Sequence, residues 1–124
     1  MASSPKRVLI CDDDRIIRAL LKTLLESLSC ELVGECANGS DAINLYATTK
    51  PDLTLMDIQM PDVSGLEAIT EIFKIDKTAK IVMISAMNDT VVAEACMQKG
   101  AIGYIQKGFG PDEIYAELAR HLES

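Results

Sequence analysis

The chain has 124 residues, a length that fits one domain with its own hydrophobic core. Hydrophobic residues make up 48% of it and charged residues 25%, which is typical of a globular protein and excludes a disordered one. The formal net charge of -7 argues against nucleic-acid binding by this domain, because that binding depends on Lys and Arg side chains that meet phosphates.

The four cysteines, Cys11, Cys30, Cys36 and Cys96, form no Cys-x-x-Cys pair. All but Cys30 lie beside apolar neighbours, so buried thiols are favoured over a zinc site or disulfides, and free thiols fit a reducing compartment. The apolar run at residues 8–11 is too short for a signal peptide, and no stretch approaches the length of a membrane span. We therefore expect a cytoplasmic protein that does not contact membranes.

Short apolar runs alternate with helical patterns from one end of the chain to the other. The runs that predict strands are residues 8–11, 32–36, 53–57, 80–84 and 102–105, the second being the weakest and nearest an edge. The helical patterns carry apolar stripes expected to face inward, at Ile17, Leu20, Leu21, Leu24, Leu25 and Leu28, at Ala42, Leu45 and Tyr46, at Leu66, Ile69, Ile72 and Phe73, and at Ile114, Leu118 and Leu122.

Cap and turn residues separate these elements. The expected helix starts and ends are the Asn38-Gly39-Ser40 turn, the Ser64-Gly65-Leu66-Glu67 capping box, Asn88 or Asp89, Gly100 as a left-handed terminus, and Gly110-Pro111. Five β/α pairs in strict alternation predict an α/β fold, a parallel sheet with helices on both faces in three layers. In such a sheet, ligands bind outside the carboxyl ends of the strands.

Polar residues stand at four of these strand ends. They are Asp12-Asp13-Asp14, Asp57, Ser85 and Gln106-Lys107. Taken singly, each is more typical of an ordinary turn residue. Together they crowd carboxylates at one edge of the sheet, where a divalent cation would relieve their repulsion. A lysine and a hydroxyl opposite would suit the oxygens of a phosphoryl group.

Four segments with these residues resemble the receiver domain of bacterial two-component response regulators of the chemotaxis-regulator kind. The segments are VLICDDD at 8–14, MDIQMPDVSGLE at 56–67, MISA at 83–86 and GYIQK at 103–107. None is specific alone, but their order and spacing make the match strong from about residue 6 to 122. The resemblance implies one receiver domain over 1–124, with a flavodoxin-like, doubly wound five-stranded sheet in the order 2-1-3-4-5 and five helices.

The resemblance also implies roles for the residues at the strand ends. Asp57 would be the phosphoacceptor that takes a phosphoryl group from a sensor histidine kinase or a phosphotransfer protein. Asp12, Asp13, Asp57 and the backbone carbonyl of Gln59 would hold Mg²⁺ as the cofactor. Lys107 would pair with Asp57 and then with the phosphoryl group. Such a domain is a regulatory phosphoacceptor rather than an enzyme, although it assists its own phosphorylation and dephosphorylation.

The implied output step is a switch made by Ser85 and Tyr104. The Ser85 hydroxyl would turn toward the phosphoryl group, and Tyr104 would move into the space it leaves. This would change the surface of the fourth helix, fifth strand and fifth helix, which would contact a downstream output domain or protein and could support a dimer. Without the resemblance, Tyr104 would be interpreted as a packed edge-strand aromatic. Asp14 is interpreted as the cap of the first helix.

The chain departs from the family pattern after Lys107, where Gly108 replaces the usual proline. The family's bond at this point is commonly cis, and a cis bond before a residue other than proline costs roughly 3 kcal/mol. We therefore expect either a trans bond with a more mobile loop or a strained one. Gln59 and Met87 occupy positions that influence the lifetime of the phosphoryl group in the family.

Three other functions are compatible with parts of the sequence. A flavin or nucleotide binder lacks its Gly-x-Gly-x-x-Gly or Walker-type loop, and a Ser-His-Asp hydrolase is disfavoured because the one histidine, His121, is a charge-tolerant residue at a helix C-terminus. The serious alternative is a receiver-like interaction module that is not phosphorylated. Ser124 follows the last helix closely, so the chain is either a stand-alone receiver or part of a longer protein with an output domain.

Overall fold

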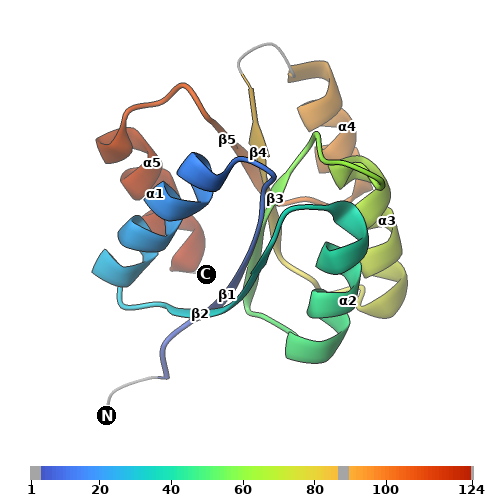
Figure 1. The fold of residues 1–124 in the computed structure, drawn as a ribbon, viewed down its shortest axis with the longest axis horizontal. Helices are drawn as coiled ribbons and strands as arrows, with labels where there is room; N and C mark the ends of the chain where they lie inside the picture. The colour runs from blue at the N-terminus through green and yellow to red at the C-terminus, as the bar shows by residue number, and fades with distance from the viewer. Residues whose placement is uncertain (1–3, 87–89, 124) are drawn as a thin grey trace.

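Strands and helices alternate along the chain in the computed structural model, which describes residues 4–86 and 90–123 (Figure 1). In chain order the elements are β1 (Arg7–Cys11), α1 (Arg15–Ser27), β2 (Glu31–Cys36), α2 (Gly39–Thr49), β3 (Leu53–Asp57), α3 (Gly65–Ile75), β4 (Ile81–Ser85), α4 (Thr90–Lys99), β5 (Gly103–Gln106) and α5 (Pro111–Leu122). The sequence prediction of five β/α pairs is confirmed, with small shifts at the element ends.

The strands form one parallel sheet in the order β2-β1-β3-β4-β5. Figure 1 shows the helices in two outer layers, with α1 and α5 on one face of the sheet and α2, α3 and α4 on the other. This confirms the predicted three-layer, flavodoxin-like fold. Because every strand runs the same way, all carboxyl ends meet at one edge of the sheet, which is the upper edge in Figure 1.

The core has two halves because the sheet is covered on both faces. The three central strands β1, β3 and β4 are almost wholly buried, which explains why they are continuous apolar runs rather than alternating patterns. Side chains such as Leu21, Leu25 and Leu118 fill one half, and Tyr46, Ile69 and Ile72 fill the other. The edge strand β2 is the most exposed, as its weaker pattern predicted.

The predicted helix caps are present where the structure describes them. Asp14 accepts from the backbone N–H groups of Ile16 and Ile17 and begins α1, while Asn38 accepts from Asp41 and begins α2. The Ser64 capping box begins α3. Gly100 follows α4 with a φ of 122°, as expected of a left-handed terminus. Asn88 and Asp89, the predicted cap of α4, lie outside the described residues, as does Met87.

The peptide bond between Lys107 and Gly108 is trans, because the described residues contain no cis bond. Of the two alternatives that the missing proline left open, the structure has the trans bond. The loop continues from Lys107 into α5, whose first residue is Pro111.

His121 lies in the last turn of α5, as predicted, but it is buried there, which the prediction of a charge-tolerant residue did not include. Its side chain is 7% exposed, and it packs against the backbone of Gly103 in β5. A Cβ atom added at Gly103 would lie 2.6 Å from His121 Cε1, so only glycine leaves room for this ring. Burial and the nearby charge of Arg120 lower the pKa of His121. The histidine therefore serves as a neutral packing group between α5 and the edge of the sheet.

Within the described ranges 4–86 and 90–123, no helix is both long and apolar enough to cross a membrane.

Candidate functional site

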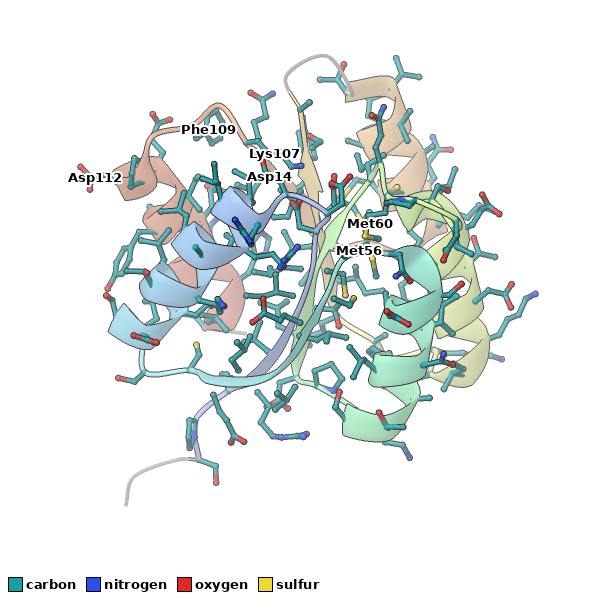
Figure 2. The ribbon with its side chains drawn as sticks, viewed as in Figure 1. Asp14, Met56, Met60, Lys107, Phe109 and Asp112 are labelled. Carbon is teal, nitrogen blue, oxygen red and sulfur yellow. The ribbon has the colours of Figure 1, made fainter. Side chains whose placement is uncertain are left out.

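Three carboxylates converge at the carboxyl edge of the sheet. Asp12 follows the last residue of β1 and is fully buried, Asp57 is the last residue of β3 and is 3% exposed, and Asp13 is exposed. One oxygen atom from each lies within 4.8 Å of the others. Figure 2 labels two residues near this edge, Asp14, which begins α1, and Lys107, which follows β5. The sequence prediction that these acids meet at one place is confirmed by this geometry.

Lys107 reaches two of the acids from the neighbouring end of β5. Its Nζ atom lies 3.1 Å from Asp57 Oδ2 and 3.3 Å from Asp12 Oδ2. Its backbone N–H donates to the carbonyl of Ser85 at 2.8 Å, which ties the start of the loop to the end of β4. A trans bond before Gly108 therefore still delivers the lysine to the carboxylates.

The carboxylates destabilise each other's charged forms. Burial, followed by the charge of Asp12, raises the pKa of Asp57 to about 7, although Lys107 opposes this shift. Burial also raises the pKa of Asp12, against the hydrogen bond from the backbone N–H of Asp14. Burial alone would lower the pKa of Lys107, but the charges of Asp12 and Asp57 raise it. The site thus holds more negative charge than its one lysine balances.

This donor set fits a hard divalent cation. Magnesium prefers carboxylate and carbonyl oxygens, and three carboxylate oxygens already lie together here. Asp12 Oδ2 is buried and, although it pairs with the charge of Lys107, it has no hydrogen-bond partner within residues 4–86 and 90–123. Gln59 also belongs to this rim, since its backbone N–H donates to Asp57 Oδ1 at 3.3 Å. A cation would satisfy these oxygens and lower their mutual repulsion.

Ser85 and Tyr104 lie on the same side of the site in neighbouring strands. Ser85 is the last residue of β4 and is fully buried, and its hydroxyl has no hydrogen-bond partner in the part of the chain that the structure describes. Tyr104 lies in β5 opposite Met83, and its half-buried ring packs against the core beneath α3 and α4. A buried hydroxyl of this kind is free to accept a new partner at the strand ends.

Arg18 is a further site residue that the sequence analysis missed. Its Nη1 atom donates to the backbone carbonyl of Asp12 at 2.6 Å, while its Nε atom pairs with Glu35 at 3.0 Å. This bond holds the chain after β1 in the position that directs Asp12 inward. The sequence feature that could have identified Arg18 was its position in α1, one turn after the capping residue Asp14.

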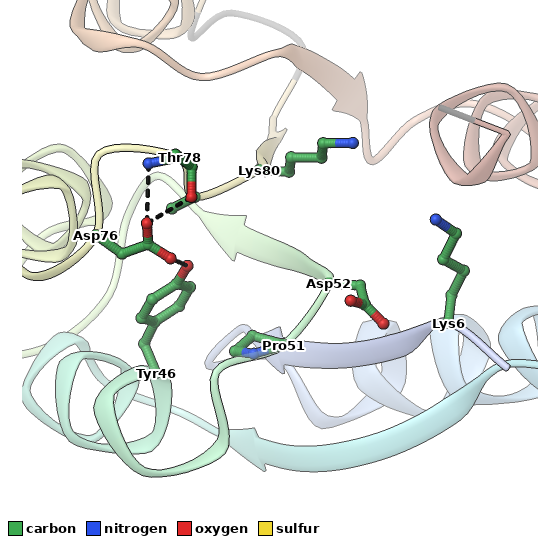
Figure 3. A pocket seen from close by; sticks show the side chains of 8 residues that line it. Lys6, Tyr46, Pro51, Asp52, Asp76, Thr78 and Lys80 are labelled. Carbon is green, nitrogen blue, oxygen red and sulfur yellow. Dashed lines mark hydrogen bonds between the residues drawn. The ribbon is translucent and has the colours of Figure 1, made fainter. Parts of the chain in front are cut away.

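A separate hollow of about 210 Å³ lies at the opposite, amino-terminal edge of the sheet (Figure 3). Tyr46 donates from its hydroxyl to Asp76 at 2.9 Å, and Asp76 also accepts from the N–H and hydroxyl of Thr78. Lys6 and Lys80 line this hollow, and Lys77 and Lys99 line a groove beside it. Asp52 and Asp76 also line the hollow, so lysines and acids are mixed there, whereas three carboxylates meet beside one lysine at the carboxyl edge, which is the edge suited to a cation.

Comparisons with known proteins agree with the geometry. Residues 8–119 match the family model described as the response regulator receiver domain. The chain is 41% identical over 113 residues to the chemotaxis protein CheY of Thermotoga maritima, covering 91% of this chain and 94% of that protein. It is 35% identical over 112 residues to the response regulator UvrY of Escherichia coli, covering 90% of this chain and 51% of UvrY. The crystal structure of the CheX-CheY-BeF3-Mg complex of Borrelia burgdorferi contains a similar chain, with a TM-score of 0.87 and 27% identity over 94% of this chain and 88% of that one.

Proposed function

The chain belongs to the response regulator receiver domain family, and from this premise we propose that Asp57 is its phosphoacceptor. The observation that carries the proposal is the pairing of a buried Asp57 with Lys107 beside two further carboxylates. The donor would be a sensor histidine kinase or a phosphotransfer protein. Asp14 needs no role in the transfer, because its side chain caps α1.

The transfer needs little from the protein beyond position and charge. An oxygen of the Asp57 carboxylate attacks the phosphorus of the donor's phosphohistidine, and the new P–O bond forms as the P–N bond breaks. The imidazole leaves and takes a proton from water, so the phosphoryl group ends as an acyl phosphate on Asp57. Lys107 lies close enough to Asp57 to exchange its carboxylate partner for a phosphoryl oxygen.

We propose that Asp12, Asp13, Asp57 and the backbone carbonyl of Gln59 hold Mg²⁺. The raised pKa of Asp57 and the buried oxygen of Asp12 without a hydrogen bond support this assignment. When bound, the ion would supply positive charge that offsets the charge of the phosphoryl oxygens. Arg18 acts on this site only indirectly, because it positions the backbone of Asp12.

We propose that Ser85 and Tyr104 carry the signal to the surface made by α4, β5 and α5. The unpartnered Ser85 hydroxyl is a donor that a phosphoryl oxygen could accept from, and Tyr104 packs on the same side of the sheet as α4. A downstream output domain or protein would bind this surface, and a dimer could form through it. The chain would act as a regulatory phosphoacceptor rather than as an enzyme with an external product.

We further propose that residues 1–124 make one receiver domain with its core at about 6–122, working in the cytoplasm. The family match over residues 8–119 supports the domain limits. Free cysteines, Cys11, Cys30, Cys36 and Cys96, support a reducing compartment. The acidic composition supports protein partners rather than nucleic acid.

The direct test is the intact mass of the protein after incubation with a small acyl-phosphate donor, with Mg²⁺ or with a chelator. We expect one added phosphoryl group that requires Mg²⁺. Borohydride reduction should convert phosphorylated Asp57 to homoserine. Peptide mapping should then find homoserine at position 57 and at no other aspartate. No uptake in the presence of ample Mg²⁺ would favour the alternative of an interaction module that is not phosphorylated.

Replacing Lys107 by alanine should slow phosphoryl uptake on the order of a hundredfold, because the variant loses the cation beside Asp57. The measurement is the initial rate of mass gain with saturating Mg²⁺. Lys99→Ala is the matched control, since it removes a lysine from the opposite edge of the sheet. Equal rates for the two variants would show that Lys107 has no part in the transfer.

Replacing Tyr104 by alanine should leave phosphoryl uptake unchanged but break the path from the site to the α4-β5-α5 surface. Amide chemical shifts measured before and after phosphorylation report both ends of this path. In wild type, the amide chemical shifts should change around Asp57 and in α4 and α5. In the variant, they should change mainly around Asp57. If uptake itself fails in a folded variant, the assigned switch role of Tyr104 is wrong.

A further inference from the structure

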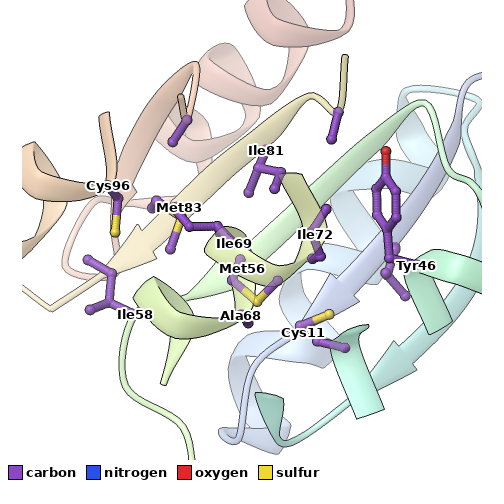
Figure 4. Packing of buried hydrophobic residues seen from close by; sticks show 14 of the residues in the cluster. Cys11, Tyr46, Met56, Ile58, Ala68, Ile69, Ile72, Ile81, Met83 and Cys96 are labelled. Atoms are coloured by element: carbon purple, nitrogen blue, oxygen red, sulfur yellow. The ribbon is translucent and has the colours of Figure 1, made fainter. Parts of the chain in front are cut away.

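Two cysteine side chains form a pair directly beneath the carboxylate site. Cys11 ends β1 and Cys36 ends β2, and the two residues are register partners in these adjacent parallel strands. Both belong to the same buried cluster, on the face covered by α2, α3 and α4. Figure 4 shows Cys11 within this cluster, close to Met56. Neither thiol is in a disulfide.

The two side chains lie on the same face of the sheet, because Cys11 and Cys36 are register partners in parallel strands and belong to one buried cluster. Neighbouring strands lie about 4.8 Å apart, and disulfides join residues whose Cα atoms are about 4.4 to 6.8 Å apart. Because β2 lies at the edge of the sheet, it pairs with β1 alone, and its end is restrained on one side only when it adjusts to an S–S bond.

The two cysteines differ in how deeply they are buried. Cys36 is 8% exposed, whereas Cys11 is fully buried. A small oxidant would reach Cys36 first, and Cys11 would then be the nearest thiol. Cys96 is fully buried on the far side of the same cluster, and Cys30 belongs to the loop between α1 and β2.

We propose that Cys11 and Cys36 are a redox modification site, at which a peroxide converts the two thiols into a reversible intrachain disulfide. Cys36 sulfur attacks one peroxide oxygen, the O–O bond breaks, and Cys36 becomes a sulfenic acid while one water leaves. Cys11 sulfur then attacks the sulfur of Cys36, and the S–O bond breaks with loss of a second water. The two thiols lose two electrons, and the peroxide gains them.

The disulfide would affect the carboxylate site, because both cysteines are directly connected to the backbone of Asp12, one by a peptide bond and the other by a hydrogen bond. Cys11 precedes Asp12 in the chain, and the carbonyl of Cys36 accepts the N–H of Asp12 at 3.0 Å. Drawing the two strand ends together would move the backbone of Asp12 and its buried carboxylate. On the premise of the proposed Mg²⁺ site, the oxidised protein should bind Mg²⁺ several-fold more weakly than the reduced protein.

The test oxidises the folded wild-type protein with dilute hydrogen peroxide, alkylates the remaining thiols after unfolding, and measures the intact mass. We expect a monomer that has lost two hydrogen atoms and carries the alkylating group on two thiols. After treatment with a dithiol reductant, all four thiols should be open to alkylation. Cleavage after Arg and Glu separates Cys11, Cys30 and Cys36 into different peptides, because Arg15, Glu31 and Glu35 lie between them. The peptide with Cys11 should be joined to the peptide with Cys36.

Controls distinguish pairing by the fold from chance oxidation. Cys96→Ala should form the same link, Cys36→Ser should not, and wild type oxidised in urea should give mixed links. A folded wild type whose thiols survive oxidation, or whose links join other cysteines or two chains, would overturn the proposal. Calorimetric titration with Mg²⁺ tests the coupling separately: no binding by the reduced protein contradicts the metal site, whereas equal binding by both forms contradicts only the coupling.

Discussion

Asp57→Asn should take up no phosphoryl group from an acyl-phosphate donor, and without Mg²⁺ it should be more stable than wild type above about pH 7. The first effect follows because an amide oxygen is a poor nucleophile, although Asn keeps the shape of the side chain. The second follows from the raised pKa of Asp57, about 7. The unfolded carboxyl group loses its proton near pH 4, while the folded one keeps it until about pH 7.

The sign of the pH dependence follows from this difference. Wild type loses stability as pH rises from about 4 to 7, and above that range the ionised Asp57 carries its full penalty. Asparagine has no such penalty. The free energy of unfolding of Asp57→Asn should therefore exceed that of wild type by roughly 2 to 4 kcal/mol at about pH 8, and the difference should vanish near pH 4. Thermal unfolding followed by circular dichroism, with a chelator present, measures it. A variant less stable than wild type at pH 8 would contradict the crowding of charge described at this site.

Gly65→Ala should destabilise the fold by roughly 3 kcal/mol or more, since this glycine lies against the backbone at the end of β3. A Cβ atom at Gly65 would lie 2.2 Å from the carbonyl oxygen of Asp57 and 2.8 Å from the Cα of Ile58. Neither atom belongs to a side chain that could turn away. Either α3 moves outward, breaking the bond from Gly65 N to the Ile58 carbonyl at 2.7 Å, or the end of β3 shifts.

Gly110→Ala is the matched control, because no atom lies within 4 Å of a Cβ at that position and its φ of -67° suits any residue. Chemical denaturation of both variants with a chelator present gives the comparison. Gly110→Ala should lose no more than about 1 kcal/mol in its free energy of unfolding, because alanine caps the start of α5 less well than glycine but meets no other atom. Similar stabilities for the two variants would mean that the connection between β3 and α3 yields to the added methyl group.

The sequence was sufficient for the fold and for the residues that meet at the site, because both depend on local patterns joined by a simple topology. Apolar runs and caps such as Asp14 and Ser64 located the elements, and parallel strands brought their carboxyl ends together. The identity of Lys107 as the partner of Asp57 came from resemblance to a family, since the two residues are fifty positions apart in the chain.

What the sequence could not predict depends on contacts between elements. The ring of His121 fits over Gly103 only because α5 crosses β5 at that point, and a histidine near a chain end otherwise indicates an exposed residue. The pairing of Cys11 with Cys36 depends on the register of β1 and β2. This register includes a shift that the residues of neither strand predict. The same holds for Arg18, whose bond to Asp12 depends on the angle at which α1 leaves the sheet.

The three carboxylates that meet beside one lysine concentrate negative charge at one edge of a chain whose net charge is already -7. The hollow at the opposite edge has no such excess, because Asp52 and Asp76 line it together with Lys6 and Lys80. An approaching partner with a basic surface would therefore be attracted to the carboxylate edge before contact. Association at that edge should therefore be faster than random collision allows and should slow as added salt shortens the range of the field.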